Sequence, residues 1–114
     1  MDNKDFTNTY KFQDKEYQCA IDLAIYLIGG KWKAIMLYHL KDGAMRSGDL
    51  QRSLNGIANK MFTQTARELE SLGLIKRVVY PVVPPKVEYQ LTPMGESVMP
   101  IIKQLGEWAA SISE

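Results

Sequence analysis

Two short segments rich in β-branched and aromatic residues, 75–80 and 86–91, are joined by a five-residue connection that holds Pro81, Pro84 and Pro85. The segments predict two antiparallel strands, and the connection is too long for a two-residue hairpin turn. Proline fixes φ and donates no backbone hydrogen bond, so we expect a stiff tip that resists pairing with other sheet edges. Thr92 and Pro93 follow at once, and a hydroxyl cap before proline is a typical helix start. The chain must therefore accommodate a hairpin with a stiff tip that leads directly into a helix.

Four helices are predicted before this hairpin. In the first, residues 21–28, apolar side chains recur at helical spacing and stop at Gly29 and Gly30, the residue type that ends helices. The next three also end at turns that contain glycine, and they span about 32–40, 47–54 and 58–72. The third and fourth helices are joined by the short turn Asn55-Gly56, which is typical of a helix-turn-helix.

The chain is predicted to close with one long helix from Pro93 to the end, bent near Pro100. Its apolar residues keep a three-four spacing over four turns: Val98, Ile101, Ile102, Leu105, Trp108, Ala109 and Ile112. Residues 1–18, by contrast, carry aromatic side chains without a period, which indicates an arm that packs loosely or on a partner. We therefore divide the chain into an N-terminal arm (1–18), a core (19–92) and a C-terminal helix (93–114).

Length and composition indicate an ordinary single domain. The chain has 114 residues, of which 46% are apolar and 24% charged, enough to fold without covalent staples. Cys19 is the only cysteine, so one chain assembles neither an internal disulfide nor a cysteine-based metal site. No apolar run approaches the ~20 residues of a membrane span, and the N-terminus is too polar for a signal peptide. We expect a cytoplasmic protein.

Catalytic chemistry has little support in this sequence. It contains no pair of carboxylates at a recognisable spacing and no nucleophile motif, and its one histidine, His39, lies on the apolar stripe of the second helix. We expect His39 to be a core or interface residue. The Gly29-Gly30-Lys31 segment lacks the spacing and the following hydroxyl of a phosphate-binding loop. The sequence therefore predicts no enzyme, no cofactor and no metal ion.

The formal net charge of +1 hides an uneven distribution. Between residues 46 and 86 the chain has seven basic and three acidic side chains, an excess of four positive charges. Such a basic segment favours a nucleic-acid partner. The seven basic residues are Arg46, Arg52, Lys60, Arg67, Lys76, Arg77 and Lys86.

The fourth helix carries the residues that point to this partner. Lys60, Thr63, Gln64 and Arg67 are spaced i, i+3, i+4 and i+7, so they project from one face, opposite the apolar stripe. A helix fits the major groove of B-DNA, where lysine or arginine reads guanine, glutamine reads adenine, and threonine contacts a phosphate or the thymine methyl. The alternative is a solvated helix face. The preceding helix and turn favour a recognition helix.

A β-hairpin that follows a recognition helix is a wing, which rests on the DNA backbone or enters the minor groove. Arg77 and Lys86 would serve the wing, and Lys76 adds charge. The alternative is a plain surface hairpin with solubilising lysines. Three further residues, on or beside the third helix, are expected to hold phosphates: Arg46, Ser47 and Arg52.

The motifs together resemble the HxlR-type transcriptional regulators, a winged helix-turn-helix family related to the MarR group. The matching elements are Cys19, LIGGKW at 27–32, the GI and KM of GIANKM, TQTARELESLGLIKR at 63–77 and YPVVPPKVEYQLTPMGE at 80–96. The resemblance covers about residues 19–108. Two positions depart from the family pattern: Ala20 replaces a usual proline, and Ala58 a usual serine. The second change removes a helix cap, typically worth ~1 kcal/mol, unless Asn59 takes over.

The resemblance implies a mainly α fold with a small β-hairpin wing, and a homodimer that packs through its first and last helices. Independently, a four-turn amphipathic helix that contains Trp108 has more apolar surface than a winged domain needs for itself. A two-fold dimer places its recognition helices about one DNA turn, or a multiple of it, apart. We therefore expect a sequence-specific, DNA-binding transcriptional regulator that acts on a pseudo-palindromic operator.

Some members of the family sense oxidants or electrophiles through the cysteine at the position of Cys19. A helix N-terminus lowers a thiol pKa, which favours the reactive thiolate. The alternative is a small apolar residue at the dimer interface. Two other hypotheses stay open: a winged-helix protein-interaction module that does not bind DNA, and a receptor with a small-molecule pocket at the dimer interface, lined by Trp32, Tyr38 or Trp108.

Overall fold

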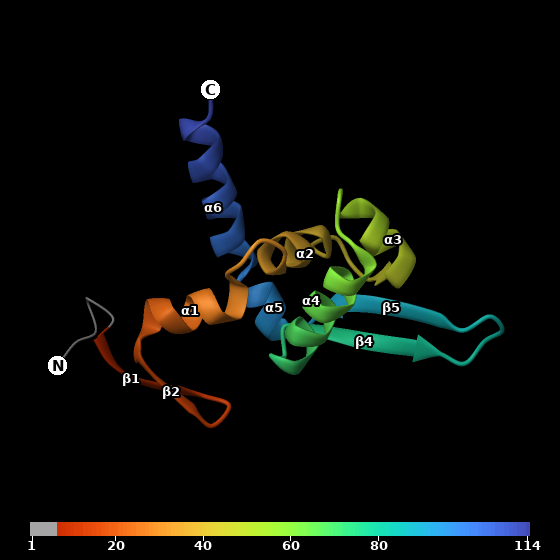
Figure 1. Ribbon diagram of the computed structural model, residues 1–114, viewed down its shortest axis with the longest axis horizontal. Coiled ribbons are helices and arrows are strands. Elements are labelled where there is room, and N and C mark those ends of the chain that lie inside the picture. The colour runs from red at the N-terminus through yellow and green to blue at the C-terminus, as the bar shows by residue number, and fades with distance from the viewer. Residues whose placement is uncertain (1–6) are drawn as a thin grey trace.

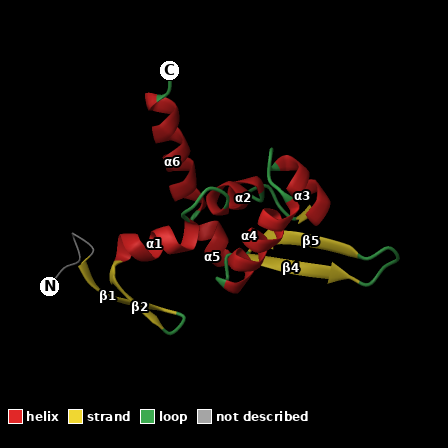
Figure 2. Cartoon of the chain, in the orientation of Figure 1, coloured by secondary structure: helices red, strands yellow, loops and turns green. Residues whose placement is uncertain are grey.

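The computed structural model describes residues 7–114, which form a hairpin, four helices with one short strand among them, a second hairpin and two helices (Figure 1). In chain order these are β1 (Thr7–Phe12), β2 (Lys15–Cys19), α1 (Ala20–Ile28), α2 (Lys33–His39), β3 (Met45–Arg46), α3 (Ser47–Ser53), α4 (Asn59–Ser71), β4 (Ile75–Tyr80), β5 (Lys86–Leu91), α5 (Pro93–Ser97) and α6 (Met99–Ile112). Figure 2 shows that the strands of residues 7–114 lie in the two hairpins and the short β3. The predicted class, mainly α with a small β-hairpin wing, is confirmed.

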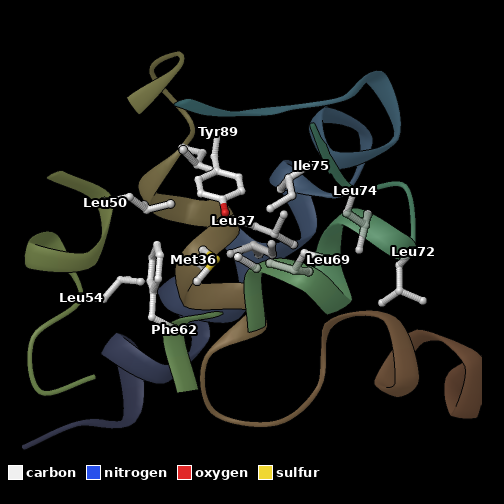
Figure 3. Close-up of a cluster of buried hydrophobic side chains, with 13 residues drawn as sticks. Met36, Leu37, Leu50, Leu54, Phe62, Leu69, Leu72, Leu74, Ile75 and Tyr89 are labelled. Carbon is white, nitrogen blue, oxygen red and sulfur yellow. The ribbon is translucent and has the colours of Figure 1, made fainter. Parts of the chain in front are cut away.

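The core lies where α2, α3 and α4 pack on the second hairpin (Figure 3). Met36 and Leu37 of α2 are fully buried, and Phe62 of α4 meets the ring of Tyr89 on β5 edge to face, with centroids 6.2 Å apart. One continuous apolar cluster therefore fixes α4 against α2, α3 and the second hairpin. Its other buried members are Leu40, Leu50, Leu54, Ala66, Leu69, Leu72, Leu74, Ile75 and Ile102.

The wing is an antiparallel pair whose bounds agree with the sequence prediction. Ile75 pairs with Leu91 and Tyr80 with Lys86, and β3 joins the other edge of β5, so the strand order is β3-β5-β4. Beyond these ladders the tip with its three prolines projects past the rest of the molecule (Figure 1). The ends of β4 and β5 nearest the core carry Ile75 and Leu91, which anchor the wing there.

The predicted helix start at Thr92 and Pro93 is confirmed, but the prediction of one continuous C-terminal helix is wrong. Thr92 caps α5, since its Oγ1 accepts from the Gly95 N–H at 3.1 Å and donates to the Gly73 carbonyl at 2.6 Å. The chain then leaves α5 at Val98 and starts α6 at Met99, where we expected one helix bent near Pro100. Proline lacks an N–H and its ring crowds the carbonyl four residues back, so Pro100 suits the first turn of a new helix better than the middle of an old one.

Residues 7–19 form a β-hairpin in a segment predicted only as an arm, and residues 1–6 of that arm lie outside the described part. Its two-residue turn has Gln13 at φ 48° and Asp14 at φ 64°, the positive values of a tight hairpin turn. The Gln13 side-chain amide donates to the carbonyl of Ser71, at the end of α4, at 2.7 Å. Phe12 packs against the core, so the hairpin is docked on the domain.

The last helix projects from the rest of the molecule (Figure 1). Ile102 is its only buried residue. The radius of gyration is 15.9 Å, against roughly 13 Å for a compact chain of this length. Among residues 7–114, no helix is long and apolar enough to cross a membrane.

Candidate nucleic-acid interface

Helix α4 presents the four predicted residues together. Phe62, Thr65, Ala66 and Leu69 are buried in the core, and a helix that buries one stripe must expose the opposite one. Lys60, Thr63, Gln64 and Arg67 are all exposed, and with Asn59 and Glu68 they line a shallow depression of 560 Å³. The structure therefore brings the predicted base-reading residues to one surface, which we call the α4 face.

The first turn of α4 has no side-chain cap. Ala58 is its N-cap residue, in extended conformation, and the neighbouring Asn59 does not take over. The Asn59 side-chain oxygen instead accepts a hydrogen bond from the amide of Gln51 on α3. This contact joins the two helices of the helix-turn-helix, while the first backbone N–H groups of α4 lack a side-chain partner.

Two charged residues not predicted from the sequence, Glu68 and Lys33, adjoin the four residues of the α4 face. The Gln64 amide nitrogen donates to Glu68 Oε1 at 3.1 Å, and Glu68 Oε2 lies 3.6 Å from the amine of Lys33 on α2. The i, i+4 spacing of Gln64 and Glu68 is a signal that could have revealed their contact. No comparable local signal links Lys33 to either residue.

The three predicted phosphate contacts cluster at the start and end of α3. Arg46 ends β3 and is the N-cap residue of α3, Ser47 is the first helical residue, and Arg52 lies in the last turn. Both arginines are exposed, and Ser47 is half-buried. Arg52 pairs with Asp49 one turn earlier, so an anion would compete with that carboxylate for its guanidinium.

The wing carries its two predicted contacts on different strands. Arg77 on β4 is exposed. Lys86 on β5 is half-buried, because its amine lies 3.3 Å from Glu88 and 4.7 Å from the centre of the Tyr80 ring. Tyr80 in turn donates its hydroxyl to Glu88 at 3.2 Å. Lys86 is therefore already partly neutralised by Glu88. At the tip of the wing, Val83 is 99% exposed.

Neither His39 nor Cys19 lines the depression on the α4 face. His39 Nδ1 lies 2.9 Å from the hydroxyl of Ser53, which itself donates to the Leu50 carbonyl, so the ring joins α2 to α3. Cys19 is half-buried at the N-cap position of α1, paired with Thr7 across the hairpin.

A groove of 660 Å³ separates α2 from α6. Of the three residues predicted to line a pocket at the dimer interface, Tyr38 lines this groove within one chain, and Trp32 and Trp108 do not. Trp32 packs partly buried against the core, whereas the side chain of Trp108 is 62% exposed.

Helices α1 and α6 expose large apolar side chains that no described residue covers. On α6 they follow at intervals of four, three and four, the spacing of a coiled-coil seam. On α1, Ile21 and Ile25 lie one turn apart. The exposed residues are Ile21, Ile25 and Tyr26 on α1, and Ile101, Leu105, Trp108 and Ile112 on α6.

Residues 27–114 match the family model of the HxlR-like helix-turn-helix proteins. An HTH-type transcriptional regulator of Methanothermobacter thermautotrophicus is 53% identical over 95 residues, which cover 83% of this chain and 72% of that protein. Among solved structures, the redox regulator HypR in its oxidised form superposes with a TM-score of 0.80 at 43% identity, over 84% of this chain and 99% of that one. The reduced transcriptional regulator YodB from B. subtilis gives a TM-score of 0.72 at 28% identity, over 83% and 93%.

Proposed function

The chain belongs to the HxlR-like helix-turn-helix family and is a DNA-binding transcriptional regulator; from this premise we propose that it acts in the cytoplasm as a homodimer on a pseudo-palindromic operator. The α4 face enters the major groove, and Lys60, Thr63, Gln64 and Arg67 contact base edges. The carrying observation is that these four side chains, chemically suited to reading bases, are exposed on one face of the second helix of a helix-turn-helix.

Phosphate contacts flank this helix in the proposal. Arg46, Ser47 and Arg52 hold one side of the groove, and the wing residues Arg77 and Lys86 hold the other. Contacts of this kind fix the register of the protein on the duplex and carry no sequence information. No catalytic step is part of the proposed function.

Dimerisation through α1 and α6 is supported by their exposed apolar residues. A seam with the spacing of Ile101, Leu105 and Trp108 pairs best with another helix, and a second copy of the chain supplies one with the same pattern. The domain boundaries proposed here are 1–18 for the arm, 19–92 for the DNA-binding core and 93–114 for dimerisation.

Base reading and phosphate binding are separated by two substitutions. An operator is selected from a random duplex library, and the affinity of each variant for operator and random DNA is measured by fluorescence anisotropy over a salt series. Arg67→Ala should lower operator affinity by about 1–3 kcal/mol and reduce the base preference at one operator position. Lys86→Ala should weaken binding to all sequences alike and reduce the slope of log affinity against log salt by about one.

The proposal fails if Arg67→Ala lowers operator and random-DNA affinity equally. A wild-type chain that binds no duplex even at low salt would instead favour the protein-interaction module.

An oxidant signal is a second proposal, favoured by Cys19 at the start of α1 and by the relatives. HypR is described as a redox regulator and has been solved in oxidised and reduced forms, and YodB also in a diamide-treated form. We propose that oxidation of Cys19 changes operator affinity. The test is operator binding before and after diamide, with Cys19→Ser as control. Slow alkylation of the native thiol together with unchanged binding after diamide would contradict it.

A further inference from the structure

Lys33 occupies an unfavourable place for a cation, because it is the first residue of α2 and a helix N-terminus carries partial positive charge. Its side chain is nevertheless only 16% exposed. The amine donates to the Tyr26 carbonyl at 2.6 Å, lies 5.2 Å from the centre of the Tyr26 ring, and lies 3.6 Å from Glu68. Three groups therefore hold this amine between α1 and α4.

Glu68 connects that fixed amine to the α4 face. One of its oxygens faces Lys33 and the other accepts the hydrogen bond from the Gln64 amide nitrogen. A carboxylate has no proton to donate, so Gln64 must turn its NH₂ group, and not its carbonyl oxygen, toward Glu68. Without such a partner, an exposed glutamine amide adopts either orientation and many rotamers.

The contact leaves the amide ready for one particular base. A glutamine reads adenine by donating to N7 and accepting from the N6 amino group. The NH₂ group of Gln64 has two protons, and Glu68 takes only one of them. The second N–H and the carbonyl oxygen are both left for the base edge.

We propose that Glu68, held by Lys33, is a positioning residue that fixes the Gln64 amide for reading adenine. This inference rests on the proposed entry of the α4 face into the major groove. The same contact would also arise if Gln64 and Glu68 only stabilised the helix as an i, i+4 pair. The two roles differ in what they predict for sequence preference.

If Glu68 positions Gln64, removal of the Glu68 charge should change DNA affinity and base preference in opposite directions. The Glu68 carboxylate lies beside the α4 face and repels phosphates, while Lys33 offsets that charge. Glu68→Gln removes the charge and places a group there that both donates and accepts, so the Gln64 amide loses its fixed orientation. Affinity for random DNA should therefore rise, while preference at the position read by Gln64 falls.

The experiment uses the full chain and a selected operator in which each base pair of one half-site is replaced in turn. Gln64→Ala first identifies the position that Gln64 reads. At this position Glu68→Gln and Lys33→Met are each expected to reduce an about tenfold preference for adenine to about twofold. Lys33→Arg, which keeps the cation, should retain the preference. Lys41→Met, on the turn after α2, is the charge-matched control and should leave the preference at every position unchanged.

The inference is overturned if Glu68→Gln and Lys33→Met keep the wild-type preference at that position, or if they lower preference at all positions alike. Thermal melts establish that each variant is folded, and Lys33→Met decides the question if Glu68→Gln does not fold. Failure of the proposed function looks different, because the wild type itself then selects no sequence.

Discussion

Replacing Trp108 by alanine tests whether α6 is a dimerisation helix. The side chain is 62% exposed, and of a tryptophan surface of about 250 Å² this leaves roughly 150 Å² to be covered by a partner. At about 25 cal/mol per Å², that burial stabilises a dimer by up to about 4 kcal/mol per protomer. A two-fold axis applies the loss twice. We expect Trp108→Ala to weaken dimerisation at least about a hundredfold, which corresponds to about 2.7 kcal/mol.

Sedimentation velocity over a concentration series measures this change, because the protomer has a mass of 13.0 kDa and a dimer twice that. Val83→Ala is the matched control, since it also shortens an exposed apolar side chain, but at the wing tip. Anisotropy on full and half operators adds a functional readout: the variant should lose affinity for the full site while its affinity for a half-site is kept.

Equal dimer dissociation constants for wild type, Trp108→Ala and Val83→Ala would refute the argument that the α6 seam carries the interface. A wild-type chain that sediments as a monomer at micromolar concentration would refute the homodimer itself.

Two further predictions concern the framework of the site. A Cβ at Gly95 would clash with the Leu74 carbonyl oxygen, so Gly95→Ala should destabilise the fold by about 1–3 kcal/mol. Its urea midpoint should fall, whereas that of Gly106→Ala, where a Cβ meets nothing within 4 Å, should not; an unchanged midpoint for Gly95→Ala would contradict the clash. Gln13→Glu places an acceptor against the Ser71 carbonyl and should speed amide exchange in β1 and β2 about fivefold, a loss of about 1 kcal/mol. Gln18→Glu on the same hairpin should leave exchange unchanged, and equal rates in both variants would argue against the Gln13 contact.

Local signals explain why much of the fold could be predicted from sequence. Prolines separate β4 from β5, and Thr92 with Pro93 marks the start of α5, so each boundary depends on neighbouring residues only. The α4 face could also be predicted from local sequence, because the spacing of the buried residues on this one helix determines which residues are exposed. Which of its side chains touch bases is a property of the complex and stays a prediction.

Contacts between distant segments explain what was missed. The N-terminal hairpin turns at Gln13 and Asp14, a pair without the Asn-Gly signal of such turns. Gln13 also hydrogen-bonds to a residue 58 positions away. The Lys33 ion pair with Glu68 likewise joins two helices that only the core brings together. Pro100 was identified from the sequence, but the residues around it fit a bend within one helix as well as the observed break at Val98.

In the dimer proposed through α6, the break at Val98 sets how far apart the two α4 faces lie. Helix α6 has 14 residues, so its far end lies about 21 Å from the break. A rotation of roughly 10° at Val98 therefore shifts that end by about 4 Å, close to the roughly 3.4 Å rise between successive bases on one strand. Two chains with identical α4 faces but different backbone angles at this residue would recognise the same half-site at different separations. In the proposed dimer, the distance between half-sites would thus change without altering any residue proposed to contact bases.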